Sequence, residues 1–588
     1  MLEQLRRDPG RTLVVLATLV AAALYLPTLA NGLLDYDDWW LYEANFVLRE
    51  PSWSSLIGVF TELDPQTPLR HALTPEYLPV RDLSVMLDFA VWGDRYGAFH
   101  FTSVVLYVVA IVLVFKLLVA WGFDRTIAGI AVLLWALHPV HAESVAWLSE
   151  RKGLLGIVFA AGAGVAYTRF RGGGSARWLV IAVLATVCAV WSKGTAAFTV
   201  AALAGLELIQ PVGRLNWRRS LVGLGALAVV GGLAFLPVVI VATRAEVVGS
   251  SVIPGGAAEI VLGVHGFYLQ LSALAMPNAV SYPVALGPSA FDIGLGALGL
   301  IAVAAALWQR RVVELRAAAV IWVATWVPVS HLVLPLHMVG VADRYALVLV
   351  LGFTLAVACG IRRLPARWQI AIVAALAIAA TWRSLDARRQ WSSDLALWER
   401  AAASNPRDLD ARSHHAAALA RAGRSDEAER VAVEGLAIGE SPKLVMRLAI
   451  LQIARGSMAE GRATMQRAAE LGEPTAMANF ASLELDAGHR DAAIAWARKA
   501  VHAAPMSAFA HATLGAAALA TGSHDEAIAA LQTTLALAPT VLNRFALGVA
   551  LVKVGRPAAA IPLLEACLAD PDVGPRARVW LDEARRPR

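Results

Sequence analysis

Three carboxylates stand close together where the first apolar run of the chain ends. Asp35, Asp37 and Asp38 lie in the stretch 31–40, directly after the apolar run 13–30. Like charges this close cannot all ionise freely, so one carboxylate should titrate high and could act as a base. The plainer alternative is a solvated acidic loop at the end of a helix.

Basic side chains lie near the ends of later apolar runs, on the side of the membrane where we expect the acidic stretch. An anionic headgroup needs such partners, because arginine grips a phosphate with two donors at once. For each cation the alternative is a side chain that snorkels to the interface. The predicted phosphate-binding residues are Arg81, Arg151, Lys152, Lys193 and Arg344.

Other polar residues fall near the same boundaries, where ionisable groups are costly and are functional candidates by default. They are Tyr77, Asp82, His138, His141, Glu143, His337 and Tyr345, together with Asp35. His138, His141 and Glu143 could hold a metal, but Pro139 disturbs the helix start and a fourth ligand is missing. Hydrogen bonding to a lipid phosphate or to the acidic loop is favoured instead. No metal site or cofactor is assigned, and assistance by a divalent cation is left open.

The composition predicts a polytopic membrane protein. Of 588 residues, 58% are hydrophobic and 16% charged, and apolar runs long enough to cross a bilayer recur. Three cysteines exclude a disulfide framework. The predicted spans, eleven in number, are 12–30, 100–120, 126–142, 153–169, 177–191, 195–210, 219–242, 290–308, 317–334, 344–361 and 368–384.

Arginine placement predicts the orientation. Basic residues precede the first span, and later basic clusters fall on the same side, so the N-terminus is expected in the cytoplasm. The outer loop 31–98 has 11 acidic residues against 4 Lys or Arg. If the apolar stretch within 244–289 crossed the membrane, the arginines that follow it would lie on the outer side. A re-entrant or interfacial segment is therefore expected there. Together these features delimit a membrane domain at 1–385, with a bacterial inner membrane as the expected location.

The last third of the chain predicts a helical repeat domain. Gly423, Gly456, Gly488, Gly522 and Gly555 recur at intervals of 33, 32, 34 and 33 residues. This is the tetratricopeptide pattern of one helix–turn–helix per repeat, with the glycine in the tight turn. We expect a linker at 386–406 and, at 407–588, about five repeats and a capping helix on the periplasmic side. Such a solenoid presents a concave surface that suits a polypeptide partner; a structural spacer is the alternative.

The residues also resemble a known family. The Asp37–Asp38 pair in the first outer loop resembles the GT-C glycosyltransferases. The segments 77–92, 135–147 and 342–345 resemble the branch of transmembrane and tetratricopeptide-repeat protein O-mannosyltransferases with their bacterial relatives. The resemblance implies an all-α chain with a GT-C-like membrane body followed by the solenoid. It also implies transfer of a sugar, mannose or another hexose, from a polyprenyl-phosphate donor to a hydroxyl of a protein acceptor.

In that chemistry a lipid phosphate is a stable leaving group that needs neutralising, and the acceptor hydroxyl needs a base. Asp37 is the first choice for the base and Asp38 the second, with inversion at the sugar carbon. Membrane lipid is a further partner, and no nucleic acid is expected. The alternatives are a non-catalytic membrane-anchored scaffold or assembly factor, a lipid-linked glycan ligase or polymerase, and a flippase. The flippase is disfavoured because residues 1–384 show no internal sequence repeat.

Overall fold

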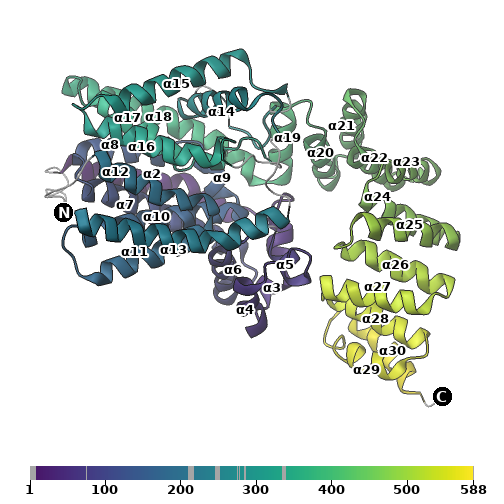
Figure 1. Ribbon diagram of the computed structural model, residues 1–588. Helices are drawn as coiled ribbons and strands as arrows, with labels where there is room; N and C mark the ends of the chain where they lie inside the picture. The colour runs from purple at the N-terminus through teal and green to yellow at the C-terminus, as the bar shows by residue number, and fades with distance from the viewer. Residues whose placement is uncertain are drawn as a thin grey trace. The chain divides into compact units, whose positions relative to one another are not determined.

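The computed structural model describes residues 8–74, 76–209, 217–245, 252–274, 276, 278–283, 286–333 and 339–586. Its regular secondary structure, over those residues, is entirely helical, so the predicted all-α class is confirmed. The chain divides into two compact units (Figure 1). Unit 1 holds residues 1–65 and 73–404, and unit 2 holds residues 66–72 and 405–588.

The long helices of unit 1 form a bundle, and shorter helices lie in the loops between them (Figure 1). The α-helices up to residue 404 are α2 (Pro9–Tyr25), α3 (Phe46–Arg49), α4 (Trp53–Thr61), α5 (Pro68–Leu73), α6 (Pro79–Trp92), α7 (Tyr96–Ala120), α8 (Arg125–Ala136), α9 (His141–Ala146), α10 (Arg151–Arg171), α11 (Ala176–Ser192), α12 (Thr199–Ile209), α13 (Trp217–Arg244), α14 (Ala257–Ser272), α15 (Ala290–Trp308), α16 (Val313–Trp326), α17 (Leu349–Ile361), α18 (Ala366–Arg389) and α19 (Asp394–Ser404). Short 3₁₀ or π turns are η1 (Leu26–Ala30), η2 (Trp39–Glu43), η3 (Leu148–Glu150), η4 (Gly194–Phe198), η6 (Val327–Val329), η7 (Asp343–Tyr345) and η8 (Gln390–Ser392).

Among the described residues, six helical segments are long and apolar enough to cross a bilayer. They are Pro9–Ala30, Tyr96–Ala120, Leu148–Arg171, Trp217–Arg244, Ala290–Trp308 and Ala366–Ser392. The other five expected spans fall on the shorter helices α8, α11, α12, α16 and α17. The chain is therefore a membrane protein, while the number of eleven spans stays a prediction.

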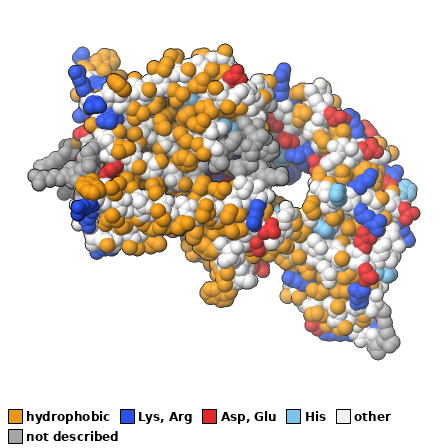
Figure 2. All heavy atoms as spheres, viewed as in Figure 1, with side chains coloured by type: hydrophobic (Ala, Val, Ile, Leu, Met, Phe, Trp, Pro, Cys, Tyr) orange, Lys and Arg blue, Asp and Glu red, His pale blue; other side chains and the backbone are white. Residues whose placement is uncertain are grey.

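The outward faces of these helices are apolar, as contact with lipid requires. Leu298, Ile301 and Trp308 of α15 are exposed, as are Val229 and Leu233 of α13. Figure 2 shows hydrophobic side chains over most of this face of unit 1, with Lys and Arg side chains at its left edge. An exposed apolar surface of this extent belongs against hydrocarbon rather than water.

The region 244–289 contains α14, which packs closely against α15. A β-carbon on Gly296 would lie 1.9 Å from the carbonyl oxygen of Leu262, and one on Gly266 would lie 2.0 Å from that of Asp292. Glycine is therefore required for the two backbones to approach, as in many membrane helix pairs. Whether α14 re-enters or lies at the interface stays a prediction.

Unit 2 contains the repeats. Over residues 405–586 its helices form five consecutive pairs and a final helix: α20 (Leu409–Arg421) with α21 (Ser425–Ile438), α22 (Pro442–Ala454) with α23 (Met458–Glu470), α24 (Pro474–Asp486) with α25 (Arg490–Ala503), α26 (Ala508–Thr521) with α27 (His524–Leu537), α28 (Val541–Lys553) with α29 (Pro557–Glu565), then α30 (Gly574–Arg585). The five spaced glycines lie in the turns within the pairs, with φ between 76° and 92°. Only glycine adopts this backbone region without strain, so the periodicity is explained by the turns.

Between the two regions, the chain remains helical. Residues 386–404, within the segment expected to be a linker, continue α18, pass through η8 and form α19. Contacts assign all of them to unit 1.

Candidate functional site

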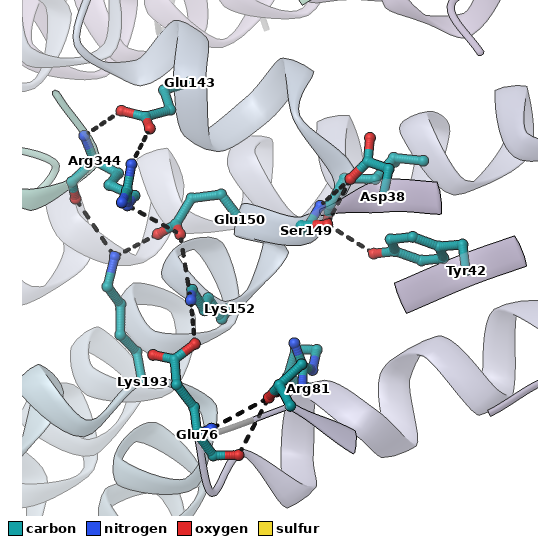
Figure 3. Close-up of polar contacts among 12 residues, drawn as sticks. Asp38, Tyr42, Glu76, Arg81, Glu143, Ser149, Glu150, Lys152, Lys193 and Arg344 are labelled. Atoms are coloured by element: carbon teal, nitrogen blue, oxygen red, sulfur yellow. Dashed lines mark hydrogen bonds and ion pairs between the residues drawn. The ribbon is translucent and has the colours of Figure 1, made fainter. Parts of the chain in front are cut away.

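Asp38 is a buried anchor for the acidic loop. Its side chain is fully buried, and its Oδ1 accepts hydrogen bonds from the Ser149 amide at 2.9 Å and the Ser149 hydroxyl at 2.5 Å (Figure 3). Its Oδ2 accepts from the Leu34 amide at 3.3 Å. Burial raises the pKa of Asp38 to about 7, although the hydrogen bonds from Ser149 oppose that rise. The carboxylate therefore ties the loop to η3, the turn that precedes α10.

Asp37, the residue before Asp38, has the opposite environment. It is exposed to solvent. Neighbouring protein atoms still desolvate the carboxyl enough to raise its pKa, while the positive charges of Lys152 and Arg344 lower it. A reachable carboxylate with a raised pKa, close to cations, has the properties of a general base.

Three cations converge on one buried carboxylate, Glu150, whose side chain has no exposed area. Lys193 Nζ is paired with Glu150 Oε1, and Lys193 also lies 3.5 Å from the Arg344 carbonyl oxygen. Lys152 Nζ and Arg344 Nε each lie 3.9 Å from Glu150 Oε2. Figure 3 shows these side chains pointing toward one another from η3, α10, the α11–η4 junction and η7. This group is called the cation cluster below: Lys152, Lys193, Arg344 and Glu150.

Two further carboxylates complete the charge balance of the cluster. Glu143 Oε1 lies 2.5 Å from Arg344 Nη1, and its Oε2 accepts from the Arg344 amide at 2.7 Å. Glu76, from the outer loop, is paired with Lys152. Burial would raise the pKa of Glu76, but Lys152 outweighs it and lowers the pKa to about 2. Sequence reasoning missed Glu76 and Glu150 as members; their only signal was a carboxylate near predicted cations.

Two of the predicted phosphate-binding arginines are committed to internal partners. Arg81 bonds the adjacent Asp82 at 2.7 Å and donates to the Leu73 carbonyl at 2.9 Å. Arg151 Nη1 lies 2.5 Å from Asp88, and its Nη2 donates to the Phe99 carbonyl at 2.9 Å. The structure therefore does not bring Arg151 into the cation cluster, whereas the charge of Arg81 still acts on Glu76.

The other predicted residues fall into two sets. Tyr345 lies in the cluster, with its ring centroid 5.2 Å from the Arg344 guanidinium carbon. Tyr77 donates to the Phe60 carbonyl at 2.9 Å, and the Asp35 amide donates to Asp394 at 2.6 Å, so both hold local structure. His337 lies outside the described residues.

The two histidines of the predicted helix face do not reach the acidic loop. His138 Nε2 lies 3.1 Å from the Ser272 carbonyl oxygen. His141 packs with its ring centroid 4.7 Å from that of Trp135 and 5.4 Å from that of Tyr107. No group of three or more His, Cys, Asp or Glu side chains in the described part of the chain is placed to hold a metal ion. His141 therefore packs at the start of α9, and His138, just before that helix, contacts the end of α14.

An apolar cavity of about 140 Å³ opens from the cation cluster into the bundle. Its charged lining residues, among those described, are Lys193 and Arg344, and Gly153 and Gly156 of α10 lie beside Lys193. The rest of the lining is mostly apolar and comes from α7, α10, α12, α16 and α17. Along α10 it runs from Gly153 to Ala161, a rise of about 12 Å. A cavity with cations at one end and hydrocarbon walls beyond suits an anionic lipid.

These features define a membrane-embedded helical protein with a charged site, an apolar cavity and a repeat domain. No family model matches the chain. A 144-residue stretch is 28% identical to the protein O-mannosyl-transferase TMTC3 of Homo sapiens, covering 22% of this chain. The match spans 16% of the length of that relative.

Part of this chain is also similar to solved structures. A TPR protein of Thermus thermophilus, TTC0263, is 20% identical, covering 30% of this chain and 98% of its own at a TM-score of 0.25. MamA of Desulfovibrio magneticus RS-1 is 17% identical, covering 30% of this chain and 97% of its own at a TM-score of 0.24.

Proposed function

We propose that the protein is a membrane glycosyltransferase of GT-C type that transfers a sugar, mannose or another hexose, from a polyprenyl-phosphate donor to a hydroxyl of a protein acceptor. The observation that carries the proposal is the apolar cavity with Lys193 and Arg344 at one end. A polyprenyl chain is pure hydrocarbon and its phosphate is an anion, so the donor matches both ends of the cavity. The partial likeness to a protein O-mannosyl-transferase supports the same chemistry.

In this mechanism the cation cluster neutralises the leaving lipid phosphate. Lys152, Lys193 and Arg344 are already assembled around Glu150, so little reorganisation is needed as negative charge develops on the phosphate. The lipid phosphate leaves as an anion, and the sugar carbon is attacked from the opposite face by the acceptor oxygen.

Asp37 takes the proton of the attacking hydroxyl. The bond from the acceptor oxygen to the sugar carbon forms as the bond from carbon to phosphate oxygen breaks, which inverts that carbon because there is a single displacement. Asp38 does not contact the reactants in this scheme, since it is buried and its oxygens accept from Ser149 and Leu34. The repeats of unit 2 would hold the acceptor polypeptide and raise its local concentration. This assignment requires the acidic loop and the repeats to face the same, periplasmic compartment.

The test is to narrow the cavity without touching a charge. Ala160 of α10 lines the cavity, and Ala160→Trp should fill it. Release of lipid phosphate is measured with the purified full chain, a panel of polyprenyl-phosphate sugars and a serine- and threonine-containing peptide mixture. We expect the KM for the donor to rise about tenfold, the equivalent of about 1.4 kcal/mol of lost donor binding.

Ala228→Trp is the matched control, because Ala228 is exposed on α13, facing away from the bundle interior. It should leave the KM unchanged. Equal effects of the two variants would contradict the cavity as the donor site. Wild-type protein that releases no lipid phosphate from any donor would favour the non-catalytic scaffold.

A further inference from the structure

The acidic loop is held from one side by the segment that runs from η8 into α19. The Asn31 amide nitrogen Nδ2 donates to the Trp391 carbonyl at 3.0 Å. The Asp35 backbone amide donates to Asp394 Oδ1 at 2.6 Å. These bonds join residues 360 and 359 positions apart in sequence, so they are formed only by the tertiary structure.

Aromatic contacts around Tyr36 also hold the loop. The Tyr36 ring lies on Trp147, with centroids 4.7 Å apart and planes 27° from parallel, and meets Trp398 edge-on at 5.5 Å and 87°. Trp147 is itself stacked on Trp391 at 5.4 Å and 17°. The three tryptophans are at most 5% exposed. Offset stacking and edge-on contacts are the favoured geometries of aromatic pairs, so Tyr36 has a defined seat.

Asp37 lies between two residues that are both fixed. Tyr36 is held by Trp147 and Trp398, and Asp38 is held by Ser149 and Leu34. The backbone on each side of Asp37 therefore has little freedom, although the Asp37 side chain is exposed. The charges of Lys152 and Arg344 lower the pKa of this carboxyl, so it lies within reach of the cation cluster.

We propose that Trp398 and Asp394 of α19 are positioning residues, which hold the Asp37 carboxylate at the cation cluster through Tyr36 and the Asp35 amide. This inference rests on the proposed function for the role of Asp37. Because α19 ends at Ser404 and the first repeat helix begins at Leu409, the chain positions its base with the helix that leads directly into the repeats.

The experiment compares Trp398→Ala with Trp398→Phe, which keeps an aromatic edge, and with Trp382→Ala as the matched control. Trp382 is 72% exposed on α18, so its loss removes a tryptophan without touching the loop. Two quantities are measured on purified full chain: amide hydrogen exchange over residues 31–42, and kcat and donor KM for release of lipid phosphate.

We expect Trp398→Ala to speed exchange at residues 34–38 at least about tenfold and to lower kcat about 100-fold, with the donor KM within about twofold of wild type. A small displacement of a catalytic group costs about this much in rate, while the cation cluster that binds the donor stays intact. Trp398→Phe should restore most of both quantities, and Trp382→Ala should change neither. Because a smaller folded fraction would also lower kcat without changing the KM, kcat is expressed per mole of folded protein, and the faster exchange must be confined to the loop.

Unchanged exchange in Trp398→Ala, or unchanged kcat with faster exchange, overturns the inference. Should Trp398→Ala fail to fold, Asp394→Ala replaces it, because that change removes the acceptor of the Asp35 amide and leaves the tryptophans in place. If wild-type protein is inactive with every donor, the proposed function fails. Hydrogen exchange then still decides whether α19 holds the loop. Faster exchange in Trp398→Ala supports a structural role of the Tyr36 contacts, and unchanged exchange contradicts it.

Discussion

The two units use the same residue types in opposite ways. In unit 2, Arg498 and Glu526 pair at 2.7 Å with 55% and 31% of their side chains exposed. In unit 1, Arg344 and Glu143 pair at 2.5 Å with 10% and 2% exposed, beside Glu150 with none. Water screens the first pair and barely reaches the second.

The difference in exposure between the two ion pairs shows where charges in this chain interact strongly. An exposed pair gains little from Coulomb attraction, because high dielectric weakens it and side-chain freedom is lost. A buried group of charges interacts strongly, and it must be balanced because an uncompensated charge there is costly. The three cations of the cluster are balanced by Glu143, Glu150 and Glu76, so their buried charges are compensated. In unit 2, the pair of Arg498 in α25 and Glu526 in α27 links two neighbouring repeats.

The largest effect should come from the exposed member of the acidic pair. Asp37→Asn should lower the transfer rate at least about 100-fold, because a general base is worth about that much or more. Its unfolding temperature should stay at the wild-type value, since the residue is exposed. The rate is measured as lipid phosphate released by purified protein, and stability by thermal unfolding in detergent. Retained activity in Asp37→Asn would refute the assignment of the base.

Removing one partner from the buried pair should cost stability. Glu143→Ala leaves the Arg344 guanidinium and amide without their main acceptor, which should destabilise unit 1 by about 3 kcal/mol. Glu143→Gln keeps an acceptor and should cost less. Thermal unfolding of both variants checks this. A loss no greater than that of an exposed pair would end the distinction between the two units.

Acid should affect Asp38 in a predictable direction. Its folded pKa, about 7, lies above the ordinary value of 3.8, so the folded state binds the proton more tightly. The contribution of Asp38 to stability is therefore full below about pH 4 and is lost as the pH rises to 7, by up to about 1.4 kcal/mol per pH unit. The wild-type curve of unfolding temperature against pH should fall more steeply than that of Asp38→Asn.

Glu76 has the opposite sign, because its lowered pKa adds stability that is lost toward pH 2. The wild-type protein and Asp38→Asn both keep Glu76, so the difference between their curves of unfolding temperature against pH reports the contribution of Asp38. Parallel curves from about pH 4 to about pH 7 would contradict the buried, protonated state.

The smallest effect should come from unit 2. Arg498→Ala removes an exposed pair and should leave the unfolding temperature unchanged within measurement error. The unfolding temperature is measured by thermal unfolding in detergent, with the wild-type protein as reference. A clear loss there would mean that repeat contacts depend on charge more than exposure suggests.

The repeats and the apolar helices could be predicted from the sequence because their causes are local. A glycine every 32 to 34 residues meets a turn with positive φ, and a run of apolar residues forms a helix that lipid accepts. That the cation candidates lie on the outer side of the membrane stays a prediction, made from the positions of the span ends. The repeat turns and the apolar helices each depend only on residues close together in the sequence and on the surrounding solvent.

The tertiary structure decided which residues of the site are exposed, which are buried and which partners they have. Asp37 and Asp38 are identical in type and adjacent, yet one is exposed and the other is anchored to Ser149, 111 residues away. Arg81 and Arg151 looked equivalent to the cluster members, but Arg81 pairs with its neighbour Asp82 and Arg151 pairs with the distant Asp88. Burial and partner choice are properties of packing between distant segments, and periodicity along the chain carries no information about them.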